Sequence, residues 1–176
     1  MKLENNNIIL RALIESDFDK YFKWHSDPEI RFQTAMHPHL ATEEIEKDWF
    51  NNAIKDMRNE RSIFSIVHKQ SNTLIGYFQL TKINMINRNA FAGIVIGEQQ
   101  YLGQGLGKEV MGLGMNYGFN SLGLNKISLE VVAGNEKAIK LYKMMGFMQE
   151  GKFIQDYYNQ GRYHDIIRLA IIKEKI

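Results

Sequence analysis

A glycine-rich turn between an apolar strand and a long helical pattern constrains this sequence more than any other feature. The strand pattern 90–96 leads into it, and Gly103, Gly105 and Gly107 stand at alternate positions before the helix. The first amides of a helix have no partner within the helix and lie at the positive end of its dipole. Glycines let a ligand approach that backbone closely, so the turn is typical of a phosphate or pyrophosphate site.

Three kinds of ligand site use such a turn, and the residues around it discriminate among them. A Walker A loop requires glycine at the position of Leu102 and Ser or Thr at the position of Glu109. A dinucleotide fingerprint requires a third glycine at the position of Lys108 and follows the first strand of a parallel sheet. The pyrophosphate loop of a coenzyme A enzyme has neither requirement. A merely flexible turn is the alternative without a ligand.

Hydrophobic periodicity along the rest of the chain predicts a mixed α/β fold. A helix over about 16–25 and another after Thr42 precede a meander of strands, and the second half alternates helix and strand, which requires some parallel pairing. No linker or repeat divides the chain, so we expect one domain over residues 1–176. The second helix is expected to bury one stripe, formed by Ile45, Trp49, Ala53 and Met57. The predicted strands are Asn7–Leu13, Ser62–His68, Leu74–Asn84, Ala90–Ile96, Lys126–Val132, Met148–Gln155 and Tyr163–Ile172.

Composition narrows the class of protein. The 176 residues include no cysteine, which excludes disulfides, thiolate zinc sites and cysteine nucleophiles and suits a reducing compartment. The net charge of +2 is too balanced for nucleic-acid binding through bulk charge. No apolar run reaches the ~18 residues of a membrane span, and the first residues lack the apolar core of a signal peptide. We therefore expect a cytoplasmic protein with no metal and with no nucleic-acid or membrane partner.

A second motif lies downstream of the glycine turn. Residues 135–147 read Asn-Glu-Lys-Ala-Ile-Lys-Leu-Tyr-Lys-Met-Met-Gly-Phe. With the turn 102–107, this stretch resembles the GNAT superfamily of N-acetyltransferases, whose members carry N-x-x-A-x-x-[LF]-Y-x-x-x-G-F and a loop [QR]-x-x-G-x-[GA]. Leu102 departs from the Gln or Arg that opens the family's loop. Because backbone amides make most of the contacts there, we expect cofactor binding to survive the departure.

Other stretches are similar to one branch of this superfamily. Arg11, Trp24 with Asp27-Pro28-Glu29, the hairpin 83–90 and the tail 156–163 resemble the branch that includes RimJ/RimL-type ribosomal-protein acetyltransferases and spermidine acetyltransferases. The resemblance implies a mixed, mostly antiparallel sheet of about seven strands, flanked by about four helices. It also implies that strands four and five are splayed apart to admit acetyl-CoA.

The resemblance further implies which residues contact acetyl-CoA. The strand edge at 94–96 would pair with the pantetheine arm, the loop 103–108 would hold the pyrophosphate, and Asn135 would lie near the thiol end. The implied cofactor residues are Ile94, Val95, Ile96, Gly103, Gln104, Gly105, Leu106, Gly107, Lys108, Asn135, Lys137 and Ala138.

The implied reaction is attack of a primary amine on the acetyl thioester. Tyr142 stands where the family places the general acid that protonates the departing thiolate; by spacing alone it would be a core-facing aromatic. Many relatives carry an acid on strand four, but residues 90–93 read Ala-Phe-Ala-Gly here. Glu98 is therefore a candidate base, and the alternatives are Glu29, Asp156, His37, His39 or a relay of waters. Glu29 and Asp156 are candidates for binding the acceptor.

The acceptor is the least determined part of the prediction. Residues 15–60 hold 11 acidic and 6 basic side chains, a balance of −5 that favours a cationic acceptor such as a polyamine like spermidine. The missing strand-four acid instead favours a protein N-terminus, whose amine is less basic. Another small amine or an amino sugar is a further alternative, and a non-catalytic acyl-CoA-binding regulatory module is the alternative of another class. Self-association into a homo-oligomer is left open.

Overall fold

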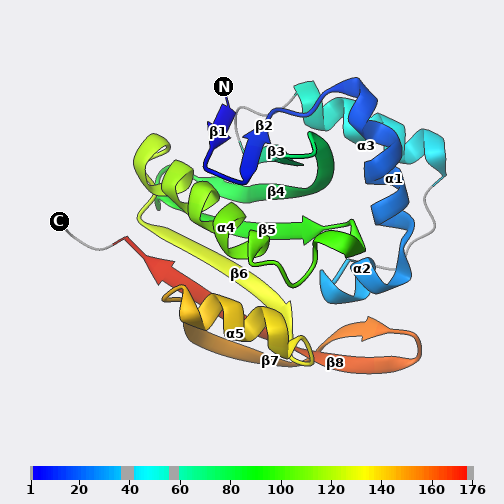
Figure 1. Ribbon diagram of the computed structural model, residues 1–176. Helices are drawn as coiled ribbons and strands as arrows, with labels where there is room; N and C mark the ends of the chain where they lie inside the picture. Colours follow the sequence, from blue (N-terminus) through cyan, green and yellow to red (C-terminus); the bar gives the residue numbers. More distant parts are fainter. Residues whose placement is uncertain (1, 37–41, 56–59, 174–176) are drawn as a thin grey trace.

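One sheet of eight strands organises the part of the chain that the computed structural model describes, residues 2–36, 42–55 and 60–173 (Figure 1). The strands lie in the order β1-β2-β3-β4-β5-β6-β8-β7. They are β1 (Lys2–Glu4), β2 (Ile8–Arg11), β3 (Ser62–His68), β4 (Thr73–Asn84), β5 (Asn89–Ile96), β6 (Lys126–Val132), β7 (Met148–Asn159) and β8 (Arg162–Ile172). The α-helices are α1 (Phe18–Ser26), α2 (Pro28–Gln33), α3 (Glu43–Lys55), α4 (Leu106–Asn116) and α5 (Glu136–Met144).

The first five strands form an antiparallel meander. Polar turns reverse the chain, as at Asn72 between β3 and β4, where φ is 51°. Asparagine tolerates this left-handed conformation better than most residues, because its side chain bonds locally to the backbone. The hairpin between β7 and β8 turns at Gln160 and Gly161, with φ of 48° and 81°. Two consecutive positive φ values are typical of the two-residue turn whose twist matches its strands.

The sheet has a short seam between its two antiparallel parts. β5 and β6 run parallel and pair only from Asn89↔Lys126 to Phe91↔Ser128. Beyond that point the two strands diverge, as the green and yellow ribbons show in Figure 1. β6 then continues into an antiparallel set with β8 and β7. The predicted splayed strands are therefore β5 and β6.

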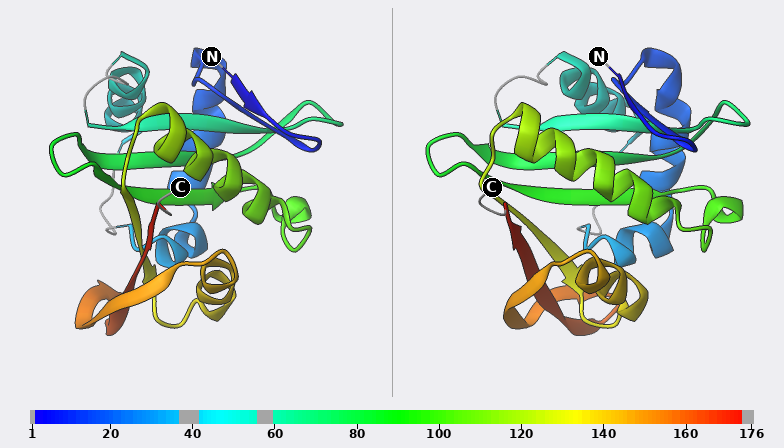
Figure 2. Two further views of the ribbon diagram at one scale, coloured as in Figure 1. Left: turned by 90° about the vertical axis from the view of Figure 1, so that its left-hand side faces the viewer. Right: turned by 60° about the vertical axis from the view of Figure 1, so that its left-hand side comes forward.

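Helices cover both faces of the sheet (Figure 2). On one face, α4 and α5 bury Val110, Met111 and Tyr142 against strand residues such as Leu80 and Leu129. On the other face, α1 and α3 pack an aromatic cluster onto the meander, formed by Phe18, Tyr21, Trp24, Phe50 and Tyr77. Burying each large apolar side chain contributes about 1.5–3 kcal/mol before entropy is counted. The two cores hold β5 from both sides.

The structure confirms the predicted fold class and adds detail to it. The described part has eight strands and five α-helices, against about seven and about four expected, because β1 and the six-residue α2 were not anticipated. The expected stripe of the second helix is wrong at its start. Ile45 is 58% exposed, and the buried residues of α3 are Phe50 and Ala53. Met57 lies outside the described residues.

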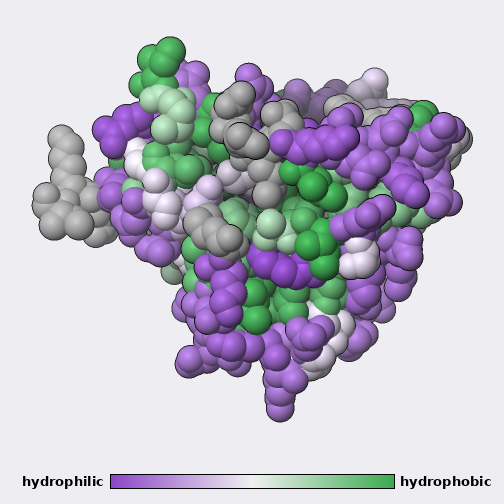
Figure 3. Space-filling model, turned by 90° about the horizontal axis from the view of Figure 1, so that it is seen from above, coloured by the Kyte–Doolittle hydropathy of each residue, from purple (hydrophilic) through white to green (hydrophobic). Residues whose placement is uncertain are grey.

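The surface bears out the amphipathic patterns of the helices. Seen from above, the right-hand side of the molecule, where α1 and α3 lie, is mostly hydrophilic, and hydrophobic residues gather toward the middle of the view (Figure 3). In the described part of the chain, no helix combines the length and apolar character needed to cross a bilayer.

Candidate active site

A cleft of about 540 Å³ lies where β5 and β6 separate. Its walls come from β5, from the loop that leads into α4, from β6 and from α5, with α2 at one side. The described residues that line it are Ile30, Gln33, Thr34, Ala92, Gly93, Ile94, Val95, Ile96, Tyr101, Leu102, Gly103, Gly105, Leu106, Gly107, Lys108, Glu130, Val131, Asn135, Lys137, Ala138, Leu141 and Tyr142.

The glycine loop forms one end of this cleft. Gly103 and Gly105 adopt φ of 76° and 80°, a region that side chains disfavour. Gly105 directly precedes α4, and no side chain caps that helix. Within the described chain, the amides of residues 103–107 make no hydrogen bond to another residue. These amides and Lys108 therefore fit an anionic ligand such as a pyrophosphate.

The inner edge of β5 forms the long wall. After Phe91 its edge toward β6 has no ladder partner among the described strands, so its backbone can pair with an extended ligand. Gly76 on β4 allows the two strands to approach closely at the end of this wall, because a side chain at that position would clash with the carbonyl of Val95. Ile94 and Ile96 pack toward α4, while Val95 belongs to the core under α1.

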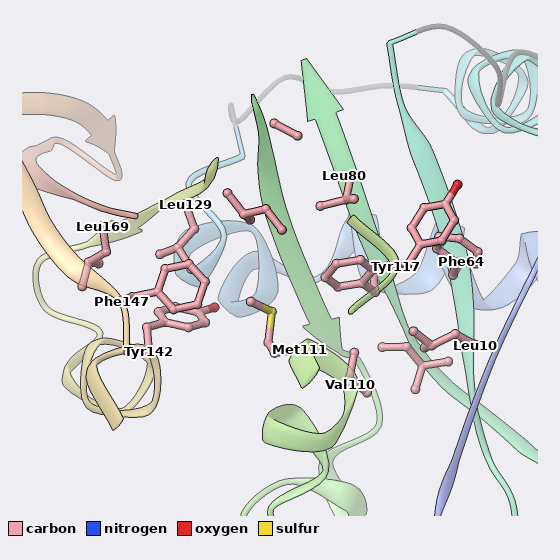
Figure 4. Close-up of a cluster of buried hydrophobic side chains, with 14 of the residues drawn as sticks. Leu10, Phe64, Leu80, Val110, Met111, Tyr117, Leu129, Tyr142, Phe147 and Leu169 are labelled. Atoms are coloured by element: carbon pink, nitrogen blue, oxygen red, sulfur yellow. The ribbon is translucent and has the colours of Figure 1, made fainter. Parts of the chain in front are cut away.

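Helix α5 brings a phenol to the opposite wall. Asn135 caps the helix, since its Oδ1 accepts from the amide of Ala138 at 3.2 Å. Tyr142 lies on the buried side of this helix beside Phe147, with ring centroids 5.8 Å apart (Figure 4). Burial raises the pKa of Tyr142 to about 12. At neutral pH the group is therefore a proton donor.

The structure brings together most of the residues implied for the cofactor but leaves two predicted residues outside the cleft lining. Glu98 forms an ion pair with Lys20 of α1, with Nζ and Oε1 3.3 Å apart. Gln104 belongs to the loop, but its side-chain amide donates to the carbonyl of Gln100 at 2.6 Å. Glu98 was inferred from its place after β5, and the contact with Lys20 draws its carboxylate toward α1.

The two predicted acceptor-binding acids also lie outside the lining. Glu29 is exposed on α2 and accepts from Gln33 at 2.9 Å. Asp156 is exposed where β7 shifts register against β8. His37 and His39 fall outside the described residues. Within the described part, no group of three or more His, Asp or Glu side chains is placed to hold a metal ion.

Sequence reasoning missed two contributors to the cleft. One is α2, whose Ile30, Gln33 and Thr34 line it. Its start was signalled by Asp27, which accepts from the amides of the second and third helical residues, and by Pro28 at the first helical position. The other is Glu130, the one acid of β6, a strand in which polar and apolar residues alternate from Lys126 to Val131.

A family model described as "Acetyltransferase (GNAT) domain" matches residues 7–148, which span the meander, the glycine loop and α5. The chain belongs to the GNAT acetyltransferase family. This confirms the resemblance inferred from the loop and from residues 135–147. Relatives with curated descriptions include spermidine N(1)-acetyltransferases. That of Vibrio cholerae serotype O1 is 32% identical over 97% of this chain and 96% of its own length. That of Escherichia coli K12 is 28% identical over 97% of this chain and 88% of its own length.

Solved structures of GNAT enzymes match this chain over nearly its whole length. Spermidine N-acetyltransferase from Vibrio cholerae in complex with CoA and spermine has a TM-score of 0.88 at 30% identity, covering 96% of each chain. A dodecameric structure of spermidine N-acetyltransferase from Vibrio cholerae has a TM-score of 0.81 at 29% identity, covering 96% of this chain and 95% of that one. The mixed sheet described above is thus the GNAT fold.

Proposed function

We propose that this chain transfers the acetyl group of acetyl-CoA to a primary amine of a polyamine such as spermidine. The observation that carries the proposal is the cleft between β5 and β6, which joins the free amides of the glycine loop to the phenol of Tyr142. An anion-binding end and a proton donor in one cleft suit a reaction that holds a pyrophosphate and expels a thiolate.

Acetyl-CoA supplies the activated thioester when bound, and the chain's own residues bind it, orient it and donate a proton. The amides of 103–107 and Lys108 bind the pyrophosphate. The free edge of β5 orients the extended arm of the substrate and excludes water from it. Tyr142 donates its proton to the departing sulfur, and its neighbour Phe147 keeps the ring in place. Asn135 caps the start of α5 and so helps to set the position of Tyr142, which the same helix carries, along the cleft.

The charge distribution and the similarity to known enzymes support a polyamine as the acceptor. Spermidine acetyltransferases are among the relatives, and one structural neighbour is a complex with CoA and spermine. The acid-rich segment 15–60 contains α1, α2 and α3, and α2 lines the cleft. An acidic surface beside the cleft raises the local concentration of a polycation and its rate of encounter.

The test is a release assay for free CoA across a panel of amines. We expect spermidine and spermine to be turned over faster than an amino sugar or a peptide with a free N-terminus. Catalytic efficiency with spermidine should fall steeply as salt rises, because salt screens the acidic segment 15–60 beside the cleft. Peptides that outperform spermidine at every salt concentration would contradict the polyamine and favour protein N-terminal acetylation instead.

The rival of another class is a regulatory module that binds acyl-CoA without turnover. Tyr142, positioned in the cleft, argues for catalysis. A rise in melting temperature with acetyl-CoA but no CoA release with any amine would favour the rival. As part of the same proposal, residues 1–176 form one cytoplasmic catalytic domain. The dodecamer of the relative supports self-association of this chain into a homo-oligomer.

A further inference from the structure

We propose that Glu130 binds the reacting amine of the acceptor and accepts its proton, and that Arg168 is the positioning residue that orients it. This assignment rests on the proposed function. It supplies the proton acceptor that neither residues 90–93 nor Glu98 provides, because 90–93 carry no acid and Glu98 lies outside the cleft lining.

Glu130 lies at the inner end of the opening in the sheet. The last paired residues of β5 and β6 are Phe91 and Ser128, and Glu130 stands two residues further along β6. Continuing that register would set Glu130 against Gly93, which has no side chain to fill the space. Among the described residues that line the cleft, Glu130 is the one carboxylate. An ammonium group entering the cleft therefore meets one side-chain carboxylate, that of Glu130.

Glu130 and Tyr142 approach the cleft from opposite faces of the sheet. Leu129 and Val131 point into the core that contains Tyr142. Because side chains alternate along a strand, Glu130 points to the other face. Its neighbour on that face, Val132, packs near Phe32 of α2. Glu130 can thus take a proton from the nitrogen of the amine while Tyr142 gives a proton to the sulfur, because the two side chains occupy different positions in the cleft.

Arg168 holds one oxygen of Glu130 and leaves the other available. The two residues are direct cross-strand partners on β6 and β8. Nε of Arg168 donates to Oε1 of Glu130 at 3.0 Å, and its NH2 group donates to the same Oε1. The guanidinium also lies over the rings of Phe91 and Phe153, 5.2 and 4.8 Å from their centroids. Oε2 makes no hydrogen bond to a described residue, so it is the atom offered to the amine.

The proton and electron balance of the step is complete with these groups. The ammonium gives one proton to Oε2 of Glu130, which later releases it to solvent. The freed lone pair forms the C–N bond to the thioester carbonyl carbon, and the C–S bond breaks. Tyr142 protonates the departing sulfur, and the second proton lost by nitrogen restores the phenol. The products are the acetamide and the free thiol of CoA.

The test is Glu130→Gln, which removes the charge but keeps an oxygen that accepts from Arg168. We expect kcat/KM for spermidine to fall by about a hundredfold or more, within the usual range for general base catalysis. Affinity for CoA, measured by calorimetry, should stay unchanged. Glu150→Gln is the matched control, because Glu150 has the same 37% side-chain exposure and is also ion-paired, to Lys126 at 2.6 Å, but lies outside the cleft lining.

A second measurement separates proton acceptance from a structural effect. An alkylammonium of pKa ~10.4 is protonated at neutral pH, whereas a weakly basic amine such as trifluoroethylamine arrives largely unprotonated. The loss in Glu130→Gln should therefore shrink for the weakly basic acceptor. Arg168→Lys should lower kcat for spermidine without changing CoA affinity.

Two outcomes overturn the assignment in distinguishable ways. An active wild-type enzyme with an equally active Glu130→Gln variant, or equal losses for both kinds of amine, overturns the role of Glu130 alone. A wild-type protein that releases no CoA with any amine overturns the proposed function and this assignment together.

Discussion

Arg11 and Asp17 form a two-pronged ion pair that ties β2 to the turn before α1. The two terminal guanidinium nitrogens of Arg11 each lie 2.7 Å from one carboxylate oxygen of Asp17. Asp17 also accepts from Ser65 on β3 at 2.7 Å and from the amide of Ile14 at 3.1 Å. Its side chain is nearly fully buried. The network therefore anchors the start of α1, and with it the helical layer next to the cleft, to the sheet.

Asp17→Asn should destabilise the protein by about 2–3 kcal/mol, because it breaks a buried charge pair and leaves Arg11 without its counterion. Urea denaturation measures this directly. Asp19→Asn, at an exposed position two residues later, is the control and should be near neutral. Equal stabilities for the two variants would contradict the anchoring role.

The same network predicts how stability responds to acid. Burial tends to raise the pKa of Asp17, but the hydrogen bonds from Arg11, Ser65 and Ile14 outweigh it, so the pKa is lowered overall. A lowered pKa means that the contribution is complete above the unfolded value of ~3.9 and is lost as pH falls through the folded pKa. The melting temperature of the wild type should thus drop more steeply below about pH 4 than that of Asp17→Asn.

Two glycines of α4 should respond to alanine with opposite signs. Gly112 is exposed, and a methyl group added to its Cα would meet no atom within 4 Å, so Gly112→Ala should stabilise by about 0.5–1 kcal/mol through helix propensity. Gly114 lies against Phe78, which is fully buried, and Gly114→Ala should destabilise by about 1–3 kcal/mol. Denaturation midpoints of the two variants give the comparison. A stabilising effect of Gly114→Ala would mean that the helix does not press on the sheet at Gly114.

Gly105→Val should weaken CoA binding by about tenfold or more, a loss of ~1.4 kcal/mol. Valine is strained at the φ of 80° and would shield the amides of the loop. Gly161→Val is the matched control, because Gly161 has φ of 81° and equally open surroundings but lies in the β7–β8 turn. Calorimetry with CoA should separate them: both variants lose stability, and only Gly105→Val loses affinity.

Tyr142→Phe should lower turnover by about 10²–10⁴-fold while leaving CoA affinity close to that of the wild type. The substitution removes the proton donor and keeps the ring packed beside Phe147. Tyr117→Phe is the control, since Tyr117 shares the same core cluster and the same 9% exposure but lies outside the cleft lining. An unchanged rate in Tyr142→Phe, under conditions where chemistry limits, would leave Tyr142 as a core residue only.

Local signals in the sequence were enough to predict most of the strands and helices. β3 and β6 begin and end where the predicted strands do, at Ser62–His68 and Lys126–Val132; the first was recognised by its content of Ile, Val and Phe. The glycine loop and the capped helix α5 were likewise predicted, because their chemistry is contained in a few consecutive residues. α2 was missed because a six-residue helix with no buried side chain has no periodicity to detect.

Contacts between distant segments account for what the sequence did not reveal at the site. Glu98 follows β5 directly, but Lys20, far away in the chain, decides where its carboxylate lies. Glu130 reads as one of the polar residues that alternate with apolar ones along β6, and its environment is set by Arg168 from β8 and by the divergence from β5. Neither relation is encoded in local spacing, because the first depends on where α1 packs on the sheet and the second on how the strands pair.

The short seam between β5 and β6 also bears on aggregation. A strand with unpaired backbone groups is a template for another chain, and proteins usually cover or charge such edges. Here the two unpaired edges that diverge after Phe91 and Ser128 face each other across the cleft, within the fold. A slender extended molecule can reach them, whereas a folded protein's strand cannot enter. At this seam the fold therefore offers strand-like pairing to a small ligand while withholding it from other polypeptides.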